Sequence, residues 1–210
     1  MIIKPKHGIK NKREFPSDPL EMSDFNKLVD GLRADKLYQW ETYVRLSFIT
    51  ALRSGDVLEL RWRDIVDSEG FIFVERKRRK EREIQFDETV RDKFIELYEL
   101  CGSPDLNLPI MCRMDTYYRT GEVKVISQQY INRRIKTFKF KYDMEIEVSR
   151  FSTHSFRKTF GKYVFDSNGK SYESILMLNS IFNHSSVRQT QDYIGITSEK
   201  IDNIYTSIKF

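Results

Sequence analysis

The stretch FIFVERKRRKEREIQF, residues 71–86, decides the fold class of this 210-residue chain. It begins and ends with short runs that contain aromatic and β-branched residues, Phe71–Val74 and Glu83–Phe86, and such runs are typical of strands. The charged run ERKRRKER joins them, and a polar connection between two strand-like runs indicates a hairpin. We therefore expect a small antiparallel sheet at this point.

On both sides of the hairpin, apolar residues recur at helical spacing. Upstream, the spacing predicts a helix that starts near Ser23, a more deeply buried helix that ends near Leu52, and a short helix after Gly55. A loop is expected from Gly102 through Gly121. The downstream helices are expected at Val90–Leu100, Ile131–Tyr142, His154–Phe165, Tyr172–Phe182 and Val187–Tyr193. The sequence thus predicts an α+β fold, mainly α-helical with one small antiparallel sheet.

The chain is long enough for one well-buried domain with at most a small appendage. Residues 1–19 are basic and are interrupted by Pro5, Gly8 and Pro16, so we interpret them as an N-terminal arm or the end of a linker. Residues 20–210 form the predicted domain. Its C-terminal segment, from about residue 197, has apolar residues at helical spacing and predicts a tail helix.

Cysteine content and hydropathy constrain the cellular setting. Cys101 and Cys112 are the two cysteines, without the paired His and Cys spacing of a zinc site, so we expect no metal site and no disulfide framework. No apolar run approaches the length of a membrane span, and the basic N-terminus lacks the apolar core of a secretory signal. We expect a soluble, cytoplasmic protein without membrane contact.

The net charge of +5 is modest, but the cations are clustered. Five basic residues lie in 1–13, six in 76–82 and five in 133–141. Clusters of this kind on a domain of pI about 9.1 match a protein that binds a phosphate backbone, so double-stranded DNA is the predicted partner. A solvated charged surface is the alternative. The cations expected to contact DNA are Arg76, Arg78, Arg79, Lys80, Arg82, Arg133, Arg134, Lys136 and Lys139.

Two short motifs place cations where they could hold an anion. In HSFR, His154 and Arg157 are three residues apart on a predicted helix, so they project from the same face. In ALRSGD, Arg53 follows a buried helix, and a planar guanidinium held there could grip a phosphate through two parallel hydrogen bonds. Either motif alone is also consistent with an ordinary polar residue at a helix end.

Two further segments could supply a proton donor and a nucleophile. A hairpin lysine could protonate a leaving alkoxide, but the residues alone do not distinguish Lys77 from Lys80. Tyr193 follows His184 by nine residues. Because a tyrosine hydroxyl has a pKa near 10, its use as a nucleophile requires nearby cations or a base. On its own, Tyr193 would be interpreted as a core aromatic.

In this order, the motifs resemble the catalytic domain of the tyrosine recombinase (phage integrase) family. The family pattern is an arginine in an A-L-R-x-G-[DE] box, a hairpin lysine, a His-x-x-Arg box, a Leu-Gly-His box and a tyrosine nine residues later. The chain reads ALRSGD, KRRKEREIQF, HSFR, FNH and QTQDYIG, and the matching residues are Arg53, Lys77, His154, Arg157, His184 and Tyr193. Two positions depart from the pattern. Asn183 replaces the usual glycine, and RKRRKER replaces the usual Lys-Thr-Gly-Lys-type turn.

The resemblance implies an enzyme that cleaves and rejoins DNA through a 3′-phosphotyrosyl intermediate, without a metal, ATP or another cofactor. Tyr193 would be the nucleophile, Lys77 the acid for the 5′ oxygen, and His154 would position the tyrosine or accept its proton. Arg53, Arg157 and His184 would hold the phosphate.

The resemblance also implies a homo-tetramer on DNA that is a monomer or weak oligomer when free. The predicted tail helix would either exchange between protomers or pack on its own domain. The short N-terminal segment fits either a compact recombinase or the catalytic domain of a larger integrase. A type IB topoisomerase-like enzyme and a catalytically silent DNA-binding homologue are the alternatives.

Overall fold

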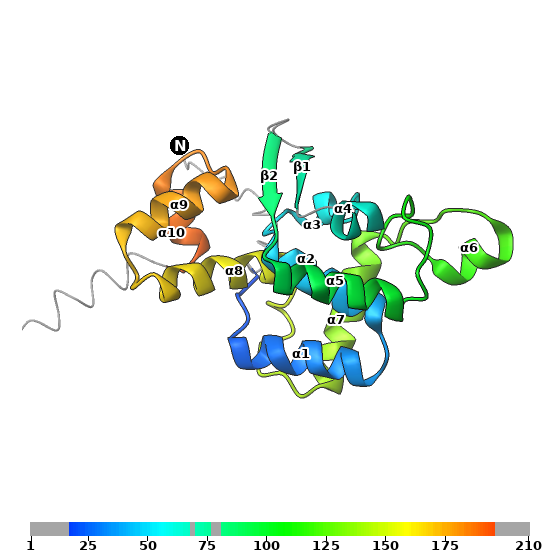
Figure 1. Ribbon diagram of the computed structural model, residues 1–210. Coiled ribbons are helices and arrows are strands. Elements are labelled where there is room, and N and C mark those ends of the chain that lie inside the picture. The colour runs from blue at the N-terminus through cyan, green and yellow to red at the C-terminus, as the bar shows by residue number, and fades with distance from the viewer. Residues whose placement is uncertain (1–16, 68–69, 77–80, 196–210) are drawn as a thin grey trace, which may run out of the picture.

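The computed structural model describes residues 17–67, 70–76 and 81–195. Within these ranges the chain is mainly helical and contains one antiparallel pair of strands (Figure 1). In chain order the elements are α1 (Met22–Ala34), α2 (Tyr38–Ile49), α3 (Ser54–Val57), α4 (Trp62–Val66), β1 (Gly70–Val74), β2 (Glu81–Gln85), α5 (Glu88–Leu100), α6 (Met114–Thr120), α7 (Gln128–Lys141), α8 (Thr153–Ser167), α9 (Tyr172–Phe182) and α10 (Val187–Tyr193). The predicted fold class is therefore confirmed.

Several details differ from the sequence prediction, and α7, for example, begins at Gln128 and not at Ile131. Strand β2 begins at Glu81, which pairs with Val74 opposite it, two residues earlier than expected. Helix α2 ends at Ile49 because the chain turns sharply at Ala51. The predicted loop between Gly102 and Gly121 contains α6, which has a single buried residue and hence no apolar stripe to indicate it. The basic arm, the tail helix and residues 77–80 lie outside the described residues.

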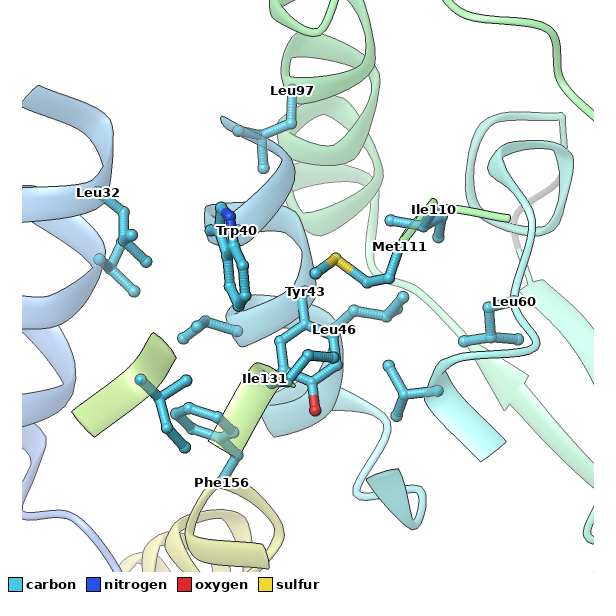
Figure 2. Close-up of a cluster of buried hydrophobic side chains, with 14 of the residues drawn as sticks. Leu32, Trp40, Tyr43, Leu46, Leu60, Leu97, Ile110, Met111, Ile131 and Phe156 are labelled. Atoms are coloured by element: carbon cyan, nitrogen blue, oxygen red, sulfur yellow. The ribbon is translucent and has the colours of Figure 1, made fainter. Parts of the chain in front are cut away.

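Helix α2 runs through the centre of the molecule and packs on α1, α5 and α8 (Figure 1). Its side chains Tyr43 and Leu46 are completely buried. Figure 2 shows them among Leu97, Ile131 and Phe156, which come from three other helices. Each such buried apolar side chain contributes about 1.5–3 kcal/mol to folding. The C-terminal end of α2 is consequently held in a rigid setting.

None of the described helices is both long enough and apolar enough to cross a membrane.

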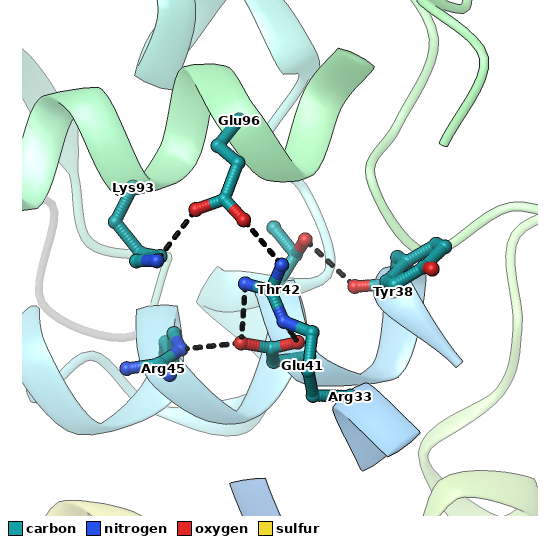
Figure 3. A network of polar contacts seen from close by, with 7 residues as sticks. All are labelled: Arg33, Tyr38, Glu41, Thr42, Arg45, Lys93 and Glu96. Carbon is teal, nitrogen blue, oxygen red and sulfur yellow. Dashed lines mark hydrogen bonds and ion pairs between the residues drawn. The ribbon is translucent and has the colours of Figure 1, made fainter. Parts of the chain in front are cut away.

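A network of charged side chains ties α1, α2 and α5 together (Figure 3). The Glu41 carboxylate, which is fully buried, forms ion pairs with Arg33 Nε at 2.7 Å and Arg45 Nε at 2.8 Å. Arg33 also pairs with Glu96, whose second oxygen lies 2.5 Å from Lys93 Nζ. A buried carboxylate requires partners of this kind, because water no longer compensates its charge.

A second, smaller apolar cluster lies between α8, α9 and α10. Gly161 in α8 permits the close contact of these helices, because a Cβ there would lie 2.8 Å from Cζ of Phe182. The buried members of the cluster are Ala51, Ile175, Leu178, Phe182 and Ile194. Ala51 connects this cluster to the end of α2, so the segments that carry the candidate site residues converge here.

Candidate active site

The site is built around a sharp backbone bend after α2. Ala51 is fully buried and adopts a left-handed conformation with φ 49°, which costs a residue other than glycine roughly 1–2 kcal/mol. The Arg157 guanidinium compensates: its Nη1 donates to the Ala51 carbonyl, and its Nη2 donates to the Phe182 carbonyl at 2.8 Å. Arg157 is only 3% exposed and lies over the Phe182 ring. One guanidinium thus joins the bend to the end of α9.

Arg53 lies two residues after this bend, immediately before α3. Its Nη1 lies 2.5 Å from Oε2 of Glu75, which is 1% exposed and directly follows β1. Asp56, one turn further along, is also buried, and its Oδ1 accepts a hydrogen bond from the Arg76 backbone N–H at 3.3 Å. Burial raises the pKa of Asp56. The hairpin is therefore joined to the Arg53 segment through two carboxylates.

Arg82 enters the same region from β2. Its Nη2 donates to the Thr50 carbonyl at 2.6 Å. Burial and the positive charges of Arg157 and Arg53 lower the pKa of Arg82 to about 10. The nearby carboxylate of Glu75 acts in the opposite direction. Arg82, Arg53 and Arg157 are close enough to influence one another electrostatically.

His154 lies in the first turn of α8, after the Ser152 side chain has capped the helix by accepting the His154 backbone N–H. Desolvation by surrounding protein lowers the pKa of His154, and so do the positive charges of Arg157, Lys158 and Arg53. A lowered pKa keeps the imidazole neutral, and a neutral imidazole can accept a proton.

His184 is placed by a left-handed turn at the end of α9. Asn183 adopts φ 51° and ψ 46°, a conformation that glycine and asparagine tolerate better than other residues. His184 Nδ1 then lies 3.0 Å from Oγ1 of Thr190, which is fully buried and donates to Oδ1 of Asn179 at 2.9 Å. Because the Thr190 hydroxyl donates its single proton to Asn179, it accepts a hydrogen bond from Nδ1 of His184. Nε2 then donates to an anion only when the ring is doubly protonated.

Tyr193 is the last residue of α10, and its ring packs against Phe182 and His184 at centroid distances of 5.1 and 5.2 Å. The Nζ of Lys158 lies over the Tyr193 ring at 5.0 Å. The hydroxyl is buried and has no partner with acceptable hydrogen-bond geometry among the described residues.

The position of this hydroxyl raises its pKa. Burial of Tyr193 is the main cause, and the opposing effects of Arg157 and Arg53 place both guanidinium groups nearby. A buried phenol beside two arginines is poorly ionised at rest. Its anion, however, would form next to positive charge.

Five of the six predicted catalytic residues therefore meet at one site: Arg53, His154, Arg157, His184 and Tyr193. Their catalytic roles stay predictions. The sixth, Lys77, lies outside the described residues, as do Arg78, Arg79 and Lys80.

The remaining predicted DNA contacts have different surroundings. Arg133 and Arg134 are exposed on α7, whereas Lys136 and Lys139 are partly buried and Lys139 Nζ donates to the Met144 carbonyl at 2.7 Å. On the hairpin, the exposed Arg76 pairs with Glu59 at 2.9 Å. The exposed cations Arg76, Arg133 and Arg134 remain the better candidates for a phosphate backbone.

Sequence reasoning missed three residues that shape the site: Glu75, Arg82 as an inward-facing group, and Thr190. A signal existed for two of them. Arg82 precedes the buried Ile84 by two residues, and Glu75 follows Phe73 by two, so strand alternation places both on the inner face. No pattern pointed to Thr190.

Comparisons with known proteins show which family and which solved structures the chain is similar to. A family model described as "Phage integrase family" matches residues 19–200. Tyrosine recombinase XerD of Staphylococcus saprophyticus subsp. saprophyticus is 23% identical over 207 residues, which cover 98% of this chain and 65% of that protein. The chain thus spans slightly less than two thirds of that relative's length.

Solved structures share the fold. The crystal structure of XerA recombinase matches with a TM-score of 0.64 and 18% identity, over 93% of this chain and 67% of that one. A lambda integrase (75–356) dimer bound to a COC′ core site matches with a TM-score of 0.62 and 16% identity, over 87% of this chain and 61% of that one. With the family match over residues 19–200, these likenesses identify the chain as a member of the phage integrase family, the tyrosine recombinases.

Proposed function

We propose that this chain is a site-specific DNA recombinase that cleaves and rejoins strands through a covalent 3′-phosphotyrosyl intermediate. The observation that carries the proposal is the position of the Tyr193 hydroxyl. It is buried at the end of α10, close enough to Arg157 and Arg53 for both charges to act on its pKa. If Tyr193 were only a core aromatic, packing would not require two arginines beside its hydroxyl.

In the proposed reaction the Tyr193 oxygen attacks the scissile phosphorus and the bond from phosphorus to the 5′ oxygen breaks. The tyrosine proton passes to the neutral imidazole of His154 or to water, and the departing 5′ oxygen takes a proton from a general acid. By resemblance this acid is Lys77. The phosphotyrosyl bond keeps the energy of the broken bond, so a 5′-hydroxyl can attack it in the reverse direction and rejoin a strand.

The arginines would stabilise the five-coordinate transition state more than the ground state. Negative charge accumulates on the non-bridging phosphate oxygens during attack, and donors held in place beforehand meet it without reorganising. Arg53, Arg157 and His184 are the proposed donors. Loss of one such donor typically raises the barrier by about 2.7–4 kcal/mol, which corresponds to 10²- to 10³-fold in rate.

Double-stranded DNA is the proposed partner. Helix α7 offers the exposed Arg133 and Arg134, and it is attached to the start of α8 because Asn132 Oδ1 accepts the Thr153 backbone N–H at 2.9 Å. DNA lying along α7 would therefore be held in a fixed relation to His154. We further propose that recombination takes place in a homo-tetramer on DNA.

The test uses a library of nicked duplexes with a randomised central segment, from which bound sequences are first selected. In a nicked substrate, cleavage releases a short strand, so rejoining fails and the covalent product accumulates. The expected result is a denaturation-resistant adduct between protein and DNA whose phosphorylated residue maps to Tyr193. The adduct is absent from Tyr193→Phe.

Three other outcomes would redirect the assignment. DNA binding without an adduct would identify a catalytically silent homologue. An adduct that persists in Tyr193→Phe would remove Tyr193 as the nucleophile. Relaxation of supercoiled plasmid without sequence preference and without strand exchange would indicate a type IB topoisomerase-like activity.

A further inference from the structure

The position of Arg82 differs from that of its basic neighbours on the hairpin. It lies on the inner face of β2, two residues before the buried Ile84 and opposite Phe73 on β1. Its Nη2 donates to the Thr50 carbonyl at 2.6 Å. The guanidinium therefore contacts the protein backbone at the end of α2 and does not face outward as Arg76 does.

The carbonyl that Arg82 holds is next to the one held by Arg157. The Thr50 carbonyl accepts from Arg82 on β2, and the Ala51 carbonyl accepts from Arg157 on α8. Two guanidinium groups from different elements thus grip successive peptide groups of one strained bend. Thr50 and Ala51 are both fully buried, so neither carbonyl could turn to water if its arginine were lost.

This bend sets the position of Arg53. Leu52 alone separates Ala51 from Arg53, and the Leu52 backbone N–H is held by Thr50 Oγ1 at 3.3 Å. Movement at Thr50 would therefore displace the backbone from which Arg53 projects. A displacement of about 1 Å at a catalytic group can lower a rate 10²-fold.

The charges around Arg82 fit a position inside the site. Arg157 and Arg53 lower its pKa, while Glu75 and Asp56 raise it, so Arg82 belongs to one group of three arginines and two carboxylates. An apolar residue would fill the space, but it would leave the Thr50 carbonyl unpaired and would remove a positive charge from this group.

We propose that Arg82 is a positioning residue of the phosphate clamp, which holds the Thr50 carbonyl and thereby fixes Arg53, and that it is not a contact to the DNA backbone. The inference rests on the proposed function, because the clamp acts on a scissile phosphate. It separates Arg82 from the other cations of the hairpin.

The experiment compares Arg82→Met, Arg82→Lys and Arg76→Met with the wild-type protein on the selected nicked duplex. Single-turnover cleavage is measured at saturating protein, and the DNA dissociation constant is measured over a range of salt concentrations. Thermal unfolding of each variant checks that it folds.

A positioning role predicts that Arg82→Met cleaves on the order of 10²-fold more slowly. Its plot of log affinity against log salt should keep the wild-type slope. Arg82→Lys, which retains a donor for the Thr50 carbonyl, should recover at least tenfold of the lost rate. Arg76→Met serves as the reference for a lost backbone contact, with a slope smaller by about 0.9.

The inference is overturned by a wild-type cleavage rate in Arg82→Met, by a slope that falls as in Arg76→Met, or by an Arg82→Lys variant that folds but is as slow as Arg82→Met. In each of these cases the wild-type adduct still forms and the proposed function stands. If the wild-type protein forms no adduct, the proposed function fails and this inference fails with it.

Discussion

Arg53 and Glu75 form a close ion pair across the site, with 2.5 Å between Nη1 and Oε2 and a carboxylate that is almost completely buried. The pair orients the guanidinium that would hold the phosphate. We expect Glu75→Gln, which retains size but loses charge, to slow cleavage at least about tenfold. Its DNA affinity should not fall, because removal of a negative charge makes the site more attractive to phosphate. Single-turnover cleavage and equilibrium binding measure the two effects, and a wild-type rate with weaker binding would contradict the prediction.

Tyr193→Phe should fold as stably as the wild-type protein. The hydroxyl is buried without a partner of acceptable geometry among the described residues, so its removal should change the free energy of unfolding by less than about 1 kcal/mol. The ring contacts with Phe182 and His184 remain. Tyr193→Ala, which loses these contacts, should cost roughly 3 kcal/mol. Urea denaturation distinguishes the two variants, and a large loss in Tyr193→Phe would reveal a structural hydrogen bond.

His154 should titrate below 6.5, the ordinary pKa of a histidine side chain. Desolvation and the nearby charges of Arg157, Lys158 and Arg53 all disfavour the imidazolium. Proton-NMR titration of its ring should show the lowered value. Arg53→Gln should raise the pKa, because one of the repelling charges is gone. If His154 accepts the tyrosine proton, cleavage should decrease as the pH falls through the folded-state pKa.

The same shift makes stability depend on pH. The unfolded chain takes up the His154 proton at a higher pH than the folded protein does. The contribution of the neutral His154 ring to the free energy of unfolding is therefore complete above pH 6.5. It declines as the pH falls toward the folded-state pKa. Denaturant midpoints of wild type and His154→Gln, compared across this range, should converge on the acid side. Parallel curves would show that the pKa is not lowered in the folded state.

Asn183 stands where the family pattern usually has glycine, and asparagine tolerates the left-handed backbone conformation at this position. At φ 51° a glycine has no steric penalty, so Asn183→Gly should unfold within about 1 kcal/mol of the wild type and keep cleavage activity. Asn183→Val should cost roughly 1–2 kcal/mol or more and should displace His184. Equilibrium unfolding and adduct formation test both variants. Equal behaviour of glycine and valine would mean that the left-handed turn does not constrain His184.

The sequence predicted the helices that carry the site because their apolar residues recur with helical period. Tyr172–Phe182 and Val187–Tyr193 have the predicted bounds, since Ser171 and Ser186 are recognisable caps. The end of α2 was wrong because the left-handed conformation of Ala51 depends on Arg157, which is 106 residues away. Local pattern contains no information about such a partner.

The candidate catalytic residues were predicted from the order of their motifs. The side chains that hold them in position were not predicted. Arg53 could be recognised in ALRSGD, but its partner Glu75 reads as the first residue of a solvated charged run. Likewise, Arg82 was placed with its basic neighbours because the whole charged run was interpreted as one connection, although alternation from Ile84 puts Arg82 on the inner face of β2. The pairing of β1 and β2 determines that face.

The two segments that carry the site differ in the free energy needed to open them locally, because one of them packs on the smaller apolar cluster. Arg53 projects from a segment anchored to the large core. His184 precedes α10 and Tyr193 is its last residue, and this helix rests on Phe182, Ile194 and their few neighbours. Segments that bury less apolar surface open at lower free energy than the whole domain unfolds. Amide hydrogens of α9 and α10 should therefore exchange with solvent well before those of α2. The proposed nucleophile, Tyr193, could then move away from the proposed phosphate clamp at a cost smaller than global unfolding, while the clamp keeps its shape.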